Sequence, residues 1–454
     1  MLSVDGQCST SEALPAKMKS PAISNCQIDN DVLLFYFKLA LAALRTALEC
    51  IYAHKLGLML SVILVLFVYV IYKSYWSPIL YLKELPDVGF NHIPKGANRD
   101  MKVARALQTR QVGTKLPPPY PNGWFALAES RDLKIGGVVS VDALGHNFAV
   151  YRGEDGVARC VDAYCPHLGA NMGVGGTVRG SCIECPFHKW TFNAEGTCVS
   201  IPDLDSPPKG ISIKTWPTAE GDGAVWVWYD AEGRSPLWSV LSPEEQEEMQ
   251  GWGYRGRNEF VVSTHIMDIP ENGADIAHLS PVHSTSVFTS VANKHPYLLN
   301  FVGHHSWEAE WTRREEHRAR MTLTHYYKFG KLSIFRLNAI ADQNGPGHVR
   351  LRFQTRFGPV LFSLSVTPIG VLRQKVVHRV FSPWYNAVMA ASFIPMESYM
   401  FERDITMWNN KRYISSPIYV KTDKSIRAFR AWYSQFYSEK SVSFKDATQN
   451  PLDW

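Results

Sequence analysis

The pattern of apolar and polar positions separates an N-terminal segment from the rest of the chain. Residues 1–31 form a polar leader, and residues 32–52 are apolar but carry Lys38, Arg45 and Glu49 at seven- and four-residue intervals. This spacing predicts an amphipathic helix that lies on a membrane surface or packs beside a neighbouring helix. A hairpin of two membrane spans is the alternative.

The most apolar run, Leu56 to Tyr72, has no charged residue over 17 positions and is bounded by Lys55 and Lys73. As a helix it would measure about 25 Å, slightly less than the hydrocarbon core of a membrane. It predicts a single-pass transmembrane anchor within residues 32–80, with a buried helix as the alternative. Lysines and arginines are more numerous after this run than before it. This asymmetry predicts that the catalytic part faces the cytosol.

A basic linker, residues 81–116, leads to a proline-rich stretch at Pro117, where the pattern changes. Residues 117–235 contain short β-branched and aromatic runs separated by Gly and Asp turns, which predict a small antiparallel β-sandwich. The clearest candidate strands are Gly137–Val141, Phe148–Tyr151 and Ala224–Tyr229.

Residues 236–415 have the pattern of a second α+β domain. Ser242, followed by Pro243 and by Glu245, is typical of a helix N-terminus. Residues 258–382 hold long alternating runs that predict antiparallel strands, and a helical pattern resumes from Ile394 to Arg412. The sequence predicts a C-terminal tail for residues 416–454.

Composition narrows the class of protein. Apolar residues make up 46% and charged residues 20%, as in a globular protein. The net charge of +5 comes without an Arg- or Lys-rich tract, so we expect no nucleic-acid partner. The eight cysteines lack the spacing of a secreted disulfide framework.

The strongest chemical signal is a pair of half-motifs, Cys165-x-His167 and Cys185-x-x-His188, separated by 17 residues. Each half offers one thiolate and one imidazole. Two Cys and two His can hold a single zinc ion or a [2Fe–2S] cluster of the Rieske type. In zinc fingers the two cysteines usually form one half-motif and the two histidines the other. Here each half-motif supplies one cysteine and one histidine, which favours the iron–sulfur cluster.

A second constellation begins at Glu271 and continues through Asp275, His278 and His283. On a helix, residues three apart share a face, so the sequence predicts that Asp275 and His278 project together. Pro281 is expected to end that helix and let His283 turn back. Two imidazoles and one carboxylate form the facial triad of non-haem Fe(II) sites, while surface histidines on an amphipathic helix are the alternative.

The carboxylate of this triad need not be local. Asp404 shares a predicted helical face with Met400, Phe401 and Trp408, and a carboxylate among apolar side chains is costly unless it is paired or binds a metal. Asp404 is therefore the favoured ligand. Glu397 and Glu402 are rivals, and a salt bridge from Asp404 to Lys411 or Arg403 is the alternative explanation.

Together, the two motifs resemble those of the Rieske-type non-haem iron oxygenases over roughly Pro117 to Arg412. The resemblance implies that the sandwich carries the cluster on Cys165, His167, Cys185 and His188. It also implies a helix-grip antiparallel sheet around a catalytic iron bound by His278, His283 and Asp404. Asp275 would bridge His278 to the cluster ligand His188 of a neighbouring subunit in a homotrimer, with Glu271 as the first residue of the family motif. Lys189 departs from the pattern, since many members have glycine there.

The apolar anchor and the run Asp404-Ile-Thr-Met-Trp408 look most similar to the cholesterol 7-desaturases, the Neverland family. That resemblance implies conversion of cholesterol to 7-dehydrocholesterol in steroid hormone or ecdysteroid synthesis. This reaction requires O₂ and electrons that a reductase takes from NAD(P)H. The resemblance also implies that the protein lies in the membrane of the endoplasmic reticulum. The alternatives are a Rieske hydroxylase of another membrane-borne ring substrate and a Rieske electron-transfer protein.

Overall fold

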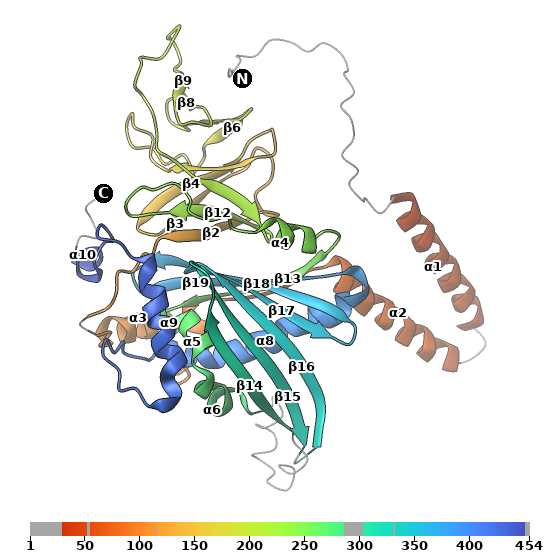
Figure 1. Cartoon of the computed structure of the whole chain (residues 1–454). Helices are drawn as coiled ribbons and strands as arrows, with labels where there is room; N and C mark the ends of the chain where they lie inside the picture. The colour runs from red at the N-terminus through yellow and green to blue at the C-terminus, as the bar shows by residue number, and fades with distance from the viewer. Residues whose placement is uncertain (1–29, 52–54, 114, 286–302, 330–331, 450–454) are drawn as a thin grey trace. The chain divides into compact units, whose positions relative to one another are not determined.

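The computed structural model describes residues 30–51, 55–113, 115–285, 303–329 and 332–449. The chain divides into a smaller unit, Ser9–Ser77, and a larger unit that contains Pro78–Trp454 (Figure 1).

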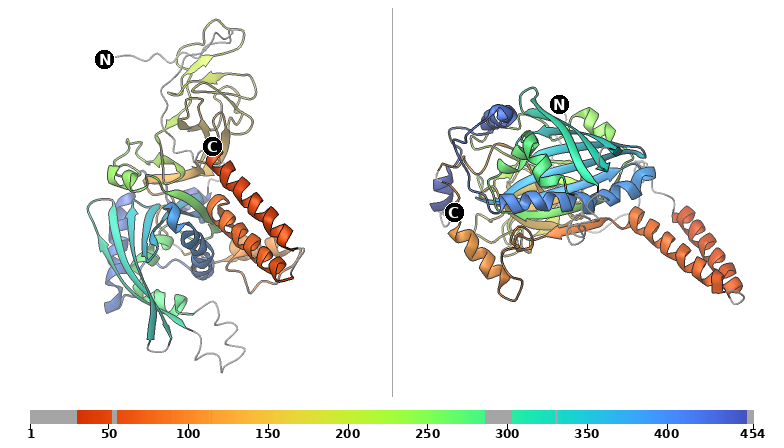
Figure 2. Two further views of the ribbon diagram at one scale, coloured as in Figure 1. Left: turned by 90° about the vertical axis from the view of Figure 1, so that its right-hand side faces the viewer. Right: turned by 90° about the horizontal axis from the view of Figure 1, so that it is seen from below.

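Two helices form the smaller unit, α1 (Asn30–Ile51) and α2 (Lys55–Trp76), and they pack side by side (Figures 1 and 2). Both predicted helices are confirmed. The predicted transmembrane span at residues 56–72 is not supported. Within the described ranges, no helix combines the length and apolar character that a membrane crossing requires.

The first half of the larger unit consists of three antiparallel sheets, with strand orders β10-β5-β4-β3, β11-β12-β2 and β6-β7-β8-β9. Their strands are β2 (Gly123–Glu129), β3 (Val138–Ala143), β4 (His146–Arg152), β5 (Ala158–Asp162), β6 (Thr177–Arg179), β7 (Cys182–Glu184), β8 (Thr191–Phe192), β9 (Cys198–Ser200), β10 (Thr215–Trp216), β11 (Thr218–Gly221) and β12 (Ala224–Tyr229). The three candidate strands are confirmed as β3, β4 and β12. Phe125, Phe148 and Val225 are fully buried between the first two sheets.

The second half is built on one eight-stranded sheet of order β1-β13-β19-β18-β17-β16-β15-β14. Its strands are β1 (Ile79–Lys83), β13 (Gly253–Val262), β14 (His304–Arg313), β15 (Arg318–Phe329), β16 (Leu332–Asn344), β17 (His348–Thr355), β18 (Gly358–Gly370) and β19 (Arg373–Ser382). All neighbours are antiparallel except β1 and β13. Helix α8 (Ala387–Trp408) lies along one face of this sheet, against β13 and β19 (Figure 2). The α+β class is confirmed.

Short helices complete the larger unit. They are α3 (Arg99–Thr109), α4 (Pro243–Glu248), α5 (Asp268–Ala274), α6 (Leu279–His283), α9 (Lys424–Tyr433) and α10 (Phe444–Gln449). The predicted helix start at Ser242 is confirmed in α4. The Ser242 hydroxyl accepts a hydrogen bond from the Glu245 amide at 3.3 Å, and the Glu245 carboxylate accepts one from the Ser242 amide at 2.8 Å.

Buried ion pairs join the sandwich to the eight-stranded sheet. Arg379 on β19 donates to both carboxylate oxygens of Glu129 on β2, with a shortest distance of 2.6 Å. Arg350 on β17 contacts Asp222, between β11 and β12, at 3.0 Å. Removing one partner of such a pair would leave an uncompensated buried charge, so these contacts fix how the two halves meet.

The predicted linker and tail contribute more to the fold than their sequences indicate. Within residues 81–116, Phe90 and Val103 are each only 1% exposed. Within residues 416–454, α9 buries Phe429, Trp432 and Tyr433 against Trp311 of β14. The apolar positions of α9 recur three and four residues apart, which is the spacing of a buried helical face.

Trp432→Ala is expected to destabilise the larger unit by about 3–5 kcal/mol, because it empties a fully enclosed aromatic site. Urea unfolding of the purified chain measures the change. Ile418→Ala is the matched control from the same segment, since Ile418 is 95% exposed and its loss should change stability by less than about 0.5 kcal/mol. Equal effects of the two substitutions would show that α9 is a dispensable tail.

Candidate metal centres

The two Cys/His half-motifs form two loops of matching backbone geometry. One follows β5 and the other joins β7 to β8. The Cys165 amide donates to the Ala170 carbonyl at 2.9 Å, and the Cys185 amide donates to the Trp190 carbonyl at 2.8 Å. The carbonyl of each cysteine also accepts a hydrogen bond from the amide four residues later in the chain. That amide belongs to Gly169 in the first loop and to Lys189 in the second. The two cysteines therefore occupy equivalent backbone positions, and each loop adds one imidazole.

These loops bring the four predicted cluster residues together. The rings of His167 and His188 lie 4.6 Å apart between centroids, and His167 stacks on Trp190 at 4.3 Å. Cys165 and Cys185 are buried, whereas His167 is exposed. Burial, together with a hydrogen bond to Cys185, raises the pKa of the Cys165 thiol to about 11. A thiolate pair in this position requires compensating positive charge, which an iron–sulfur cluster would supply.

The departure at Lys189 has a visible backbone consequence. Gly169 and Lys189 occupy equivalent places in the two loops, with φ of 72° and 61°. A left-handed conformation costs glycine little but strains other residues, which explains why glycine suits this position. The Lys189 ammonium lies 3.3 Å from the carboxylate of Glu184, so the added charge is paired within the protein.

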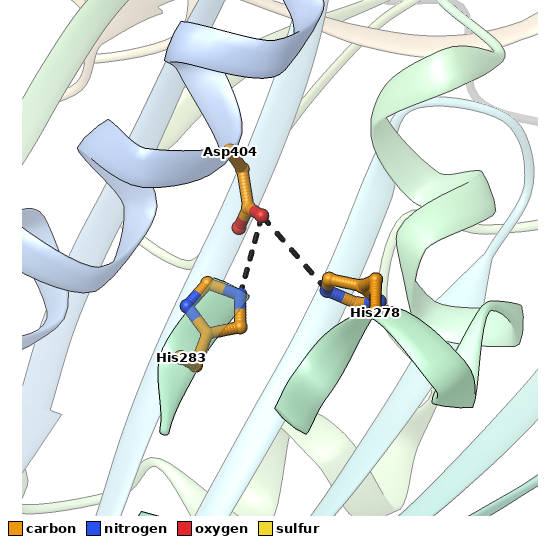
Figure 3. A group of neighbouring side chains, drawn as sticks. All are labelled: His278, His283 and Asp404. Carbon is orange, nitrogen blue, oxygen red and sulfur yellow. Dashed lines mark ion pairs between the residues drawn. The ribbon is translucent and has the colours of Figure 1, made fainter. Parts of the chain in front are cut away.

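The second centre gathers His278, His283 and Asp404 (Figure 3). One nitrogen from each histidine and one oxygen of Asp404 lie within 4.8 Å of one another. Asp404 Oδ1 is 3.2 Å from His283 Nε2 and 3.9 Å from His278 Nε2. His283 and Asp404 are buried, and His278 is half-buried. Two imidazoles and a carboxylate aimed at one point are a donor set that fits non-haem Fe(II).

The local helix that carries the histidines differs from the prediction. Asp275 and His278 do not share one helical face, because α5 ends at Ala274 and Asp275 adopts ψ of 80°. His278 closes a single 3-10 turn, and His283 ends α6, which contains Pro281 rather than stopping before it. Proline is tolerated in a first helical turn since its missing amide is not needed there. The break at Asp275 therefore turns His278 toward His283.

Asp404 is the carboxylate of this centre, and its rivals have other partners. Glu397 contacts His378 at 2.8 Å, and Glu402 accepts a hydrogen bond from the Tyr81 hydroxyl at 2.6 Å. The proposed salt bridges to Asp404 are also absent from the part of the chain that the structure describes. Lys411 pairs with Asp268 at 2.7 Å, while Arg403 donates to the carbonyls of Val282 and Thr285. The neighbours of Asp404 are instead His278 and His283, and a metal ion held by all three would compensate the charge of its carboxylate.

Two acidic residues of the predicted motif have structural contacts. Asp275 accepts a hydrogen bond from the His278 amide at 3.3 Å, and its backbone carbonyl is bonded to His278 Nδ1. This second contact fixes the ring and leaves Nε2 facing Asp404. Glu271 forms an ion pair with Arg430 of α9 and lies outside the metal-binding group.

A largely apolar cavity adjoins this centre. It holds about 930 Å³ of empty space, its open mouth included, and lies between the inner face of the eight-stranded sheet and helices α5 and α8. Asp404, Phe401 and Trp408 line it from α8. Leu351, Val366 and Val376 line it from the sheet. The lining is mostly apolar with a few polar groups, which is the character of sites that bind apolar ligands.

The chain matches two family models, and the model that covers the Cys/His loops precedes the model that covers His278, His283 and Asp404. Residues 123–217 match the Rieske [2Fe-2S] domain, and residues 227–437 match the 3-ketosteroid 9alpha-hydroxylase C-terminal domain. A cholesterol 7-desaturase of Bombyx mori is 60% identical over 85% of this chain and 84% of its own length. The chain belongs to the cholesterol 7-desaturase family of Rieske oxygenases. The Drosophila melanogaster relative is 38% identical over 83% of this chain and 91% of its own length.

Among solved structures, NdmA of Pseudomonas putida CBB5 has the same fold. It is 15% identical, with a TM-score of 0.50 over 71% of this chain and 94% of that protein. The family accounts for both donor sets, because Rieske oxygenases use a [2Fe–2S] cluster and a mononuclear Fe(II).

The sequence did not reveal the residues that surround the substrate. Val376 and His378 alternate on β19 and face the cavity with residues of β17 and β18. Their apolar neighbours are indistinguishable from core residues in a sequence. The one available signal was a histidine that alternates with Val376 and Val380 on one face of a strand.

Proposed function

We propose that this protein converts cholesterol to 7-dehydrocholesterol. In the balanced reaction, cholesterol, O₂, NAD(P)H and one proton give 7-dehydrocholesterol, NAD(P)⁺ and two waters. The observation that carries the proposal is the apolar cavity that is lined by Asp404, the residue that His278 and His283 join in the metal-binding group. Cholesterol 7-desaturases of several animals, including Hemicentrotus pulcherrimus and Xenopus laevis at 41% identity, share most of the chain.

Cys165, His167, Cys185 and His188 would hold the cluster, and His278, His283 and Asp404 would hold Fe(II). When bound, the cluster supplies single electrons and the iron supplies the capacity to reduce O₂ at the expense of a C–H bond. The protein's own contribution is positional. The apolar lining would hold the sterol beside Asp404, while the Asp275 carbonyl keeps His278 oriented.

The placement of the two centres favours a homotrimer. The Cys/His loops and α6 lie at opposite ends of the larger unit in two views (Figures 1 and 2). Electrons from one chain's cluster would therefore reach the iron centre of a neighbouring chain, across Asp275. Leu168 and Phe187, both more than 60% exposed at the loop tips, would serve contact with that neighbour or with an electron-donating reductase.

We also propose that the smaller unit attaches the protein to a membrane, with the catalytic part in the cytosol and the endoplasmic reticulum as the membrane. The support is the run of exposed apolar side chains along α2, from Leu58 to Tyr72. Side chains of this kind are favourable in contact with lipid, where sterols also partition.

A hydroxylase is the second candidate. A probable 3-ketosteroid-9-alpha-monooxygenase oxygenase component of Rhodococcus rhodochrous is 30% identical over 73% of this chain. Both reactions need the same metal centres and would differ in the fate of the oxygen.

Product analysis separates these candidates. Membranes that contain the full chain, a reductase, NAD(P)H and labelled cholesterol are expected to form a sterol two hydrogens lighter, with the ultraviolet bands of a conjugated diene. A product heavier by one oxygen would replace the desaturase by a hydroxylase. Unchanged cholesterol with both metal centres loaded would refute the assignment of the substrate.

A further inference from the structure

The cavity beside the metal-binding group contains few polar side chains. Apart from the indole nitrogens of two tryptophans, four lining residues have polar or charged groups: Asn272, Gln343, His378 and Asp404. Asp404 is accounted for by the metal centre. The three others are candidates for contact with the substrate, because isolated polar groups in an apolar pocket usually fix a ligand's orientation.

His378 is the most firmly positioned of the three. It is 1% exposed on β19, and its Nδ1 lies 2.8 Å from Glu397 Oε1 on α8. Asn258 on β13 donates to the other oxygen of Glu397. A carboxylate only accepts hydrogen bonds, so in the neutral ring Nδ1 carries the proton and Nε2 is an acceptor.

The acceptor nitrogen has no partner among the described residues, although the ring lines the cavity. The ring packs edge-on against Phe401, with 4.6 Å between centroids. A ligand hydroxyl in the cavity could therefore donate a hydrogen bond to Nε2.

His378 is held by a residue that lies a short way along α8 from Asp404. Its partner Glu397 precedes Asp404 by seven residues on α8, which corresponds to two helical turns and about 10 Å. In cholesterol the only polar group is the hydroxyl on C3 of ring A. C7 and C8 lie in the adjacent ring B. A group that holds the hydroxyl about two helical turns from the metal ligands would therefore leave ring B facing them.

We infer that His378, held by Glu397, accepts a hydrogen bond from the sterol 3-hydroxyl and thereby sets which carbons face the metal centre. The inference rests on the proposed function and adds a positioning residue to it. Gln343 is the rival anchor, but its amide nitrogen already donates to the Gly345 carbonyl at 3.2 Å.

Binding of two sterols tests this role without relying on turnover. Dissociation constants are measured with radiolabelled cholesterol and with cholest-5-ene, which lacks the hydroxyl, for the full-length wild-type protein and for His378→Leu. The ratio of the two constants is expected to shift about tenfold in the variant, the effect of one lost hydrogen bond. Partition of each sterol into detergent or lipid is the same for both proteins and cancels from this comparison.

Two further variants separate positioning from folding. Glu397→Gln removes the carboxylate that fixes the ring, so it should shift the same ratio in the same direction and form additional oxidised sterols besides 7-dehydrocholesterol. Gln343→Leu should leave the ratio unchanged. Equal weakening of both sterols by His378→Leu and Glu397→Gln would overturn the inference, as would a shift seen only with Gln343→Leu.

The role of His378 and the proposed function are refuted by different results. If the wild-type protein forms 7-dehydrocholesterol but the ratio is the same in every variant, His378 does not hold the hydroxyl and the proposed function stands. If the wild-type protein forms no 7-dehydrocholesterol, the proposed function is refuted, and the role of His378 that rests on it is refuted too.

Discussion

Replacing Asp404 with alanine is expected to remove the mononuclear iron and to lower sterol desaturation by more than about a hundredfold. Asp404 is buried, lies 3.2 Å from His283 Nε2, and has no Lys or Arg partner among the described residues. Its loss leaves two imidazoles to bind the metal, and even changes behind the metal ligands commonly cost 10- to about 100-fold. Iron analysis and electron paramagnetic resonance of the reduced protein measure the two centres separately.

The Rieske signal should persist in Asp404→Ala, because the Cys/His loops lie at the other end of the larger unit (Figure 1). Glu402→Gln is the matched control on the same helix. Glu402 is bonded to Tyr81, so this variant should retain its iron and most of its activity. Full iron content and activity in Asp404→Ala would exclude Asp404 as a ligand.

Cys185→Ser is expected to abolish the cluster and all NAD(P)H-supported turnover. Cys185 is 1% exposed, and its loop holds the thiol beside that of Cys165. A serine hydroxyl ionises much less readily than a thiol, so it is a poor replacement for a buried thiolate ligand. The purified variant should lack the Rieske absorption bands and the corresponding paramagnetic signal.

Cys198→Ala provides the control for this substitution. Cys198 is also buried in the small sheet, but its sulfur contacts the Ser200 carbonyl at 3.7 Å and it belongs to neither half-motif. This variant should keep the spectrum and the activity. A normal Rieske spectrum in Cys185→Ser would refute the cluster assignment, and loss of the spectrum in both variants would indicate a general folding defect.

The candidate metal-binding residues could be picked out from the sequence because most of them occur at short, characteristic spacings. Cys165-x-His167 and Cys185-x-x-His188 need only two tight turns to present their ligands. Asp404 is distant in sequence, yet a carboxylate on an apolar helical face is unusual enough to stand out. The strands and α8 followed from simple alternation and helical periodicity.

Long-range packing explains what the sequence did not show. The burial of α9 depends on Trp311 and on the ion pair between Glu271 and Arg430, which join segments more than a hundred residues apart. The break at Asp275 reflects a single backbone angle rather than a helix-breaking residue. His378 faces the cavity because of the register of β19 with β18, which only the folded sheet defines.

A turnover experiment under ¹⁸O₂ tests the central claim most directly. Membranes with the full-length protein, reductase, NAD(P)H and cholesterol are analysed by mass spectrometry of the sterol and of the water, with Asp404→Ala as the inactive control. Desaturation predicts a sterol two mass units lighter that contains no ¹⁸O, with the label recovered in water. A sterol that carries one ¹⁸O atom and retains its C7–C8 single bond would contradict the account.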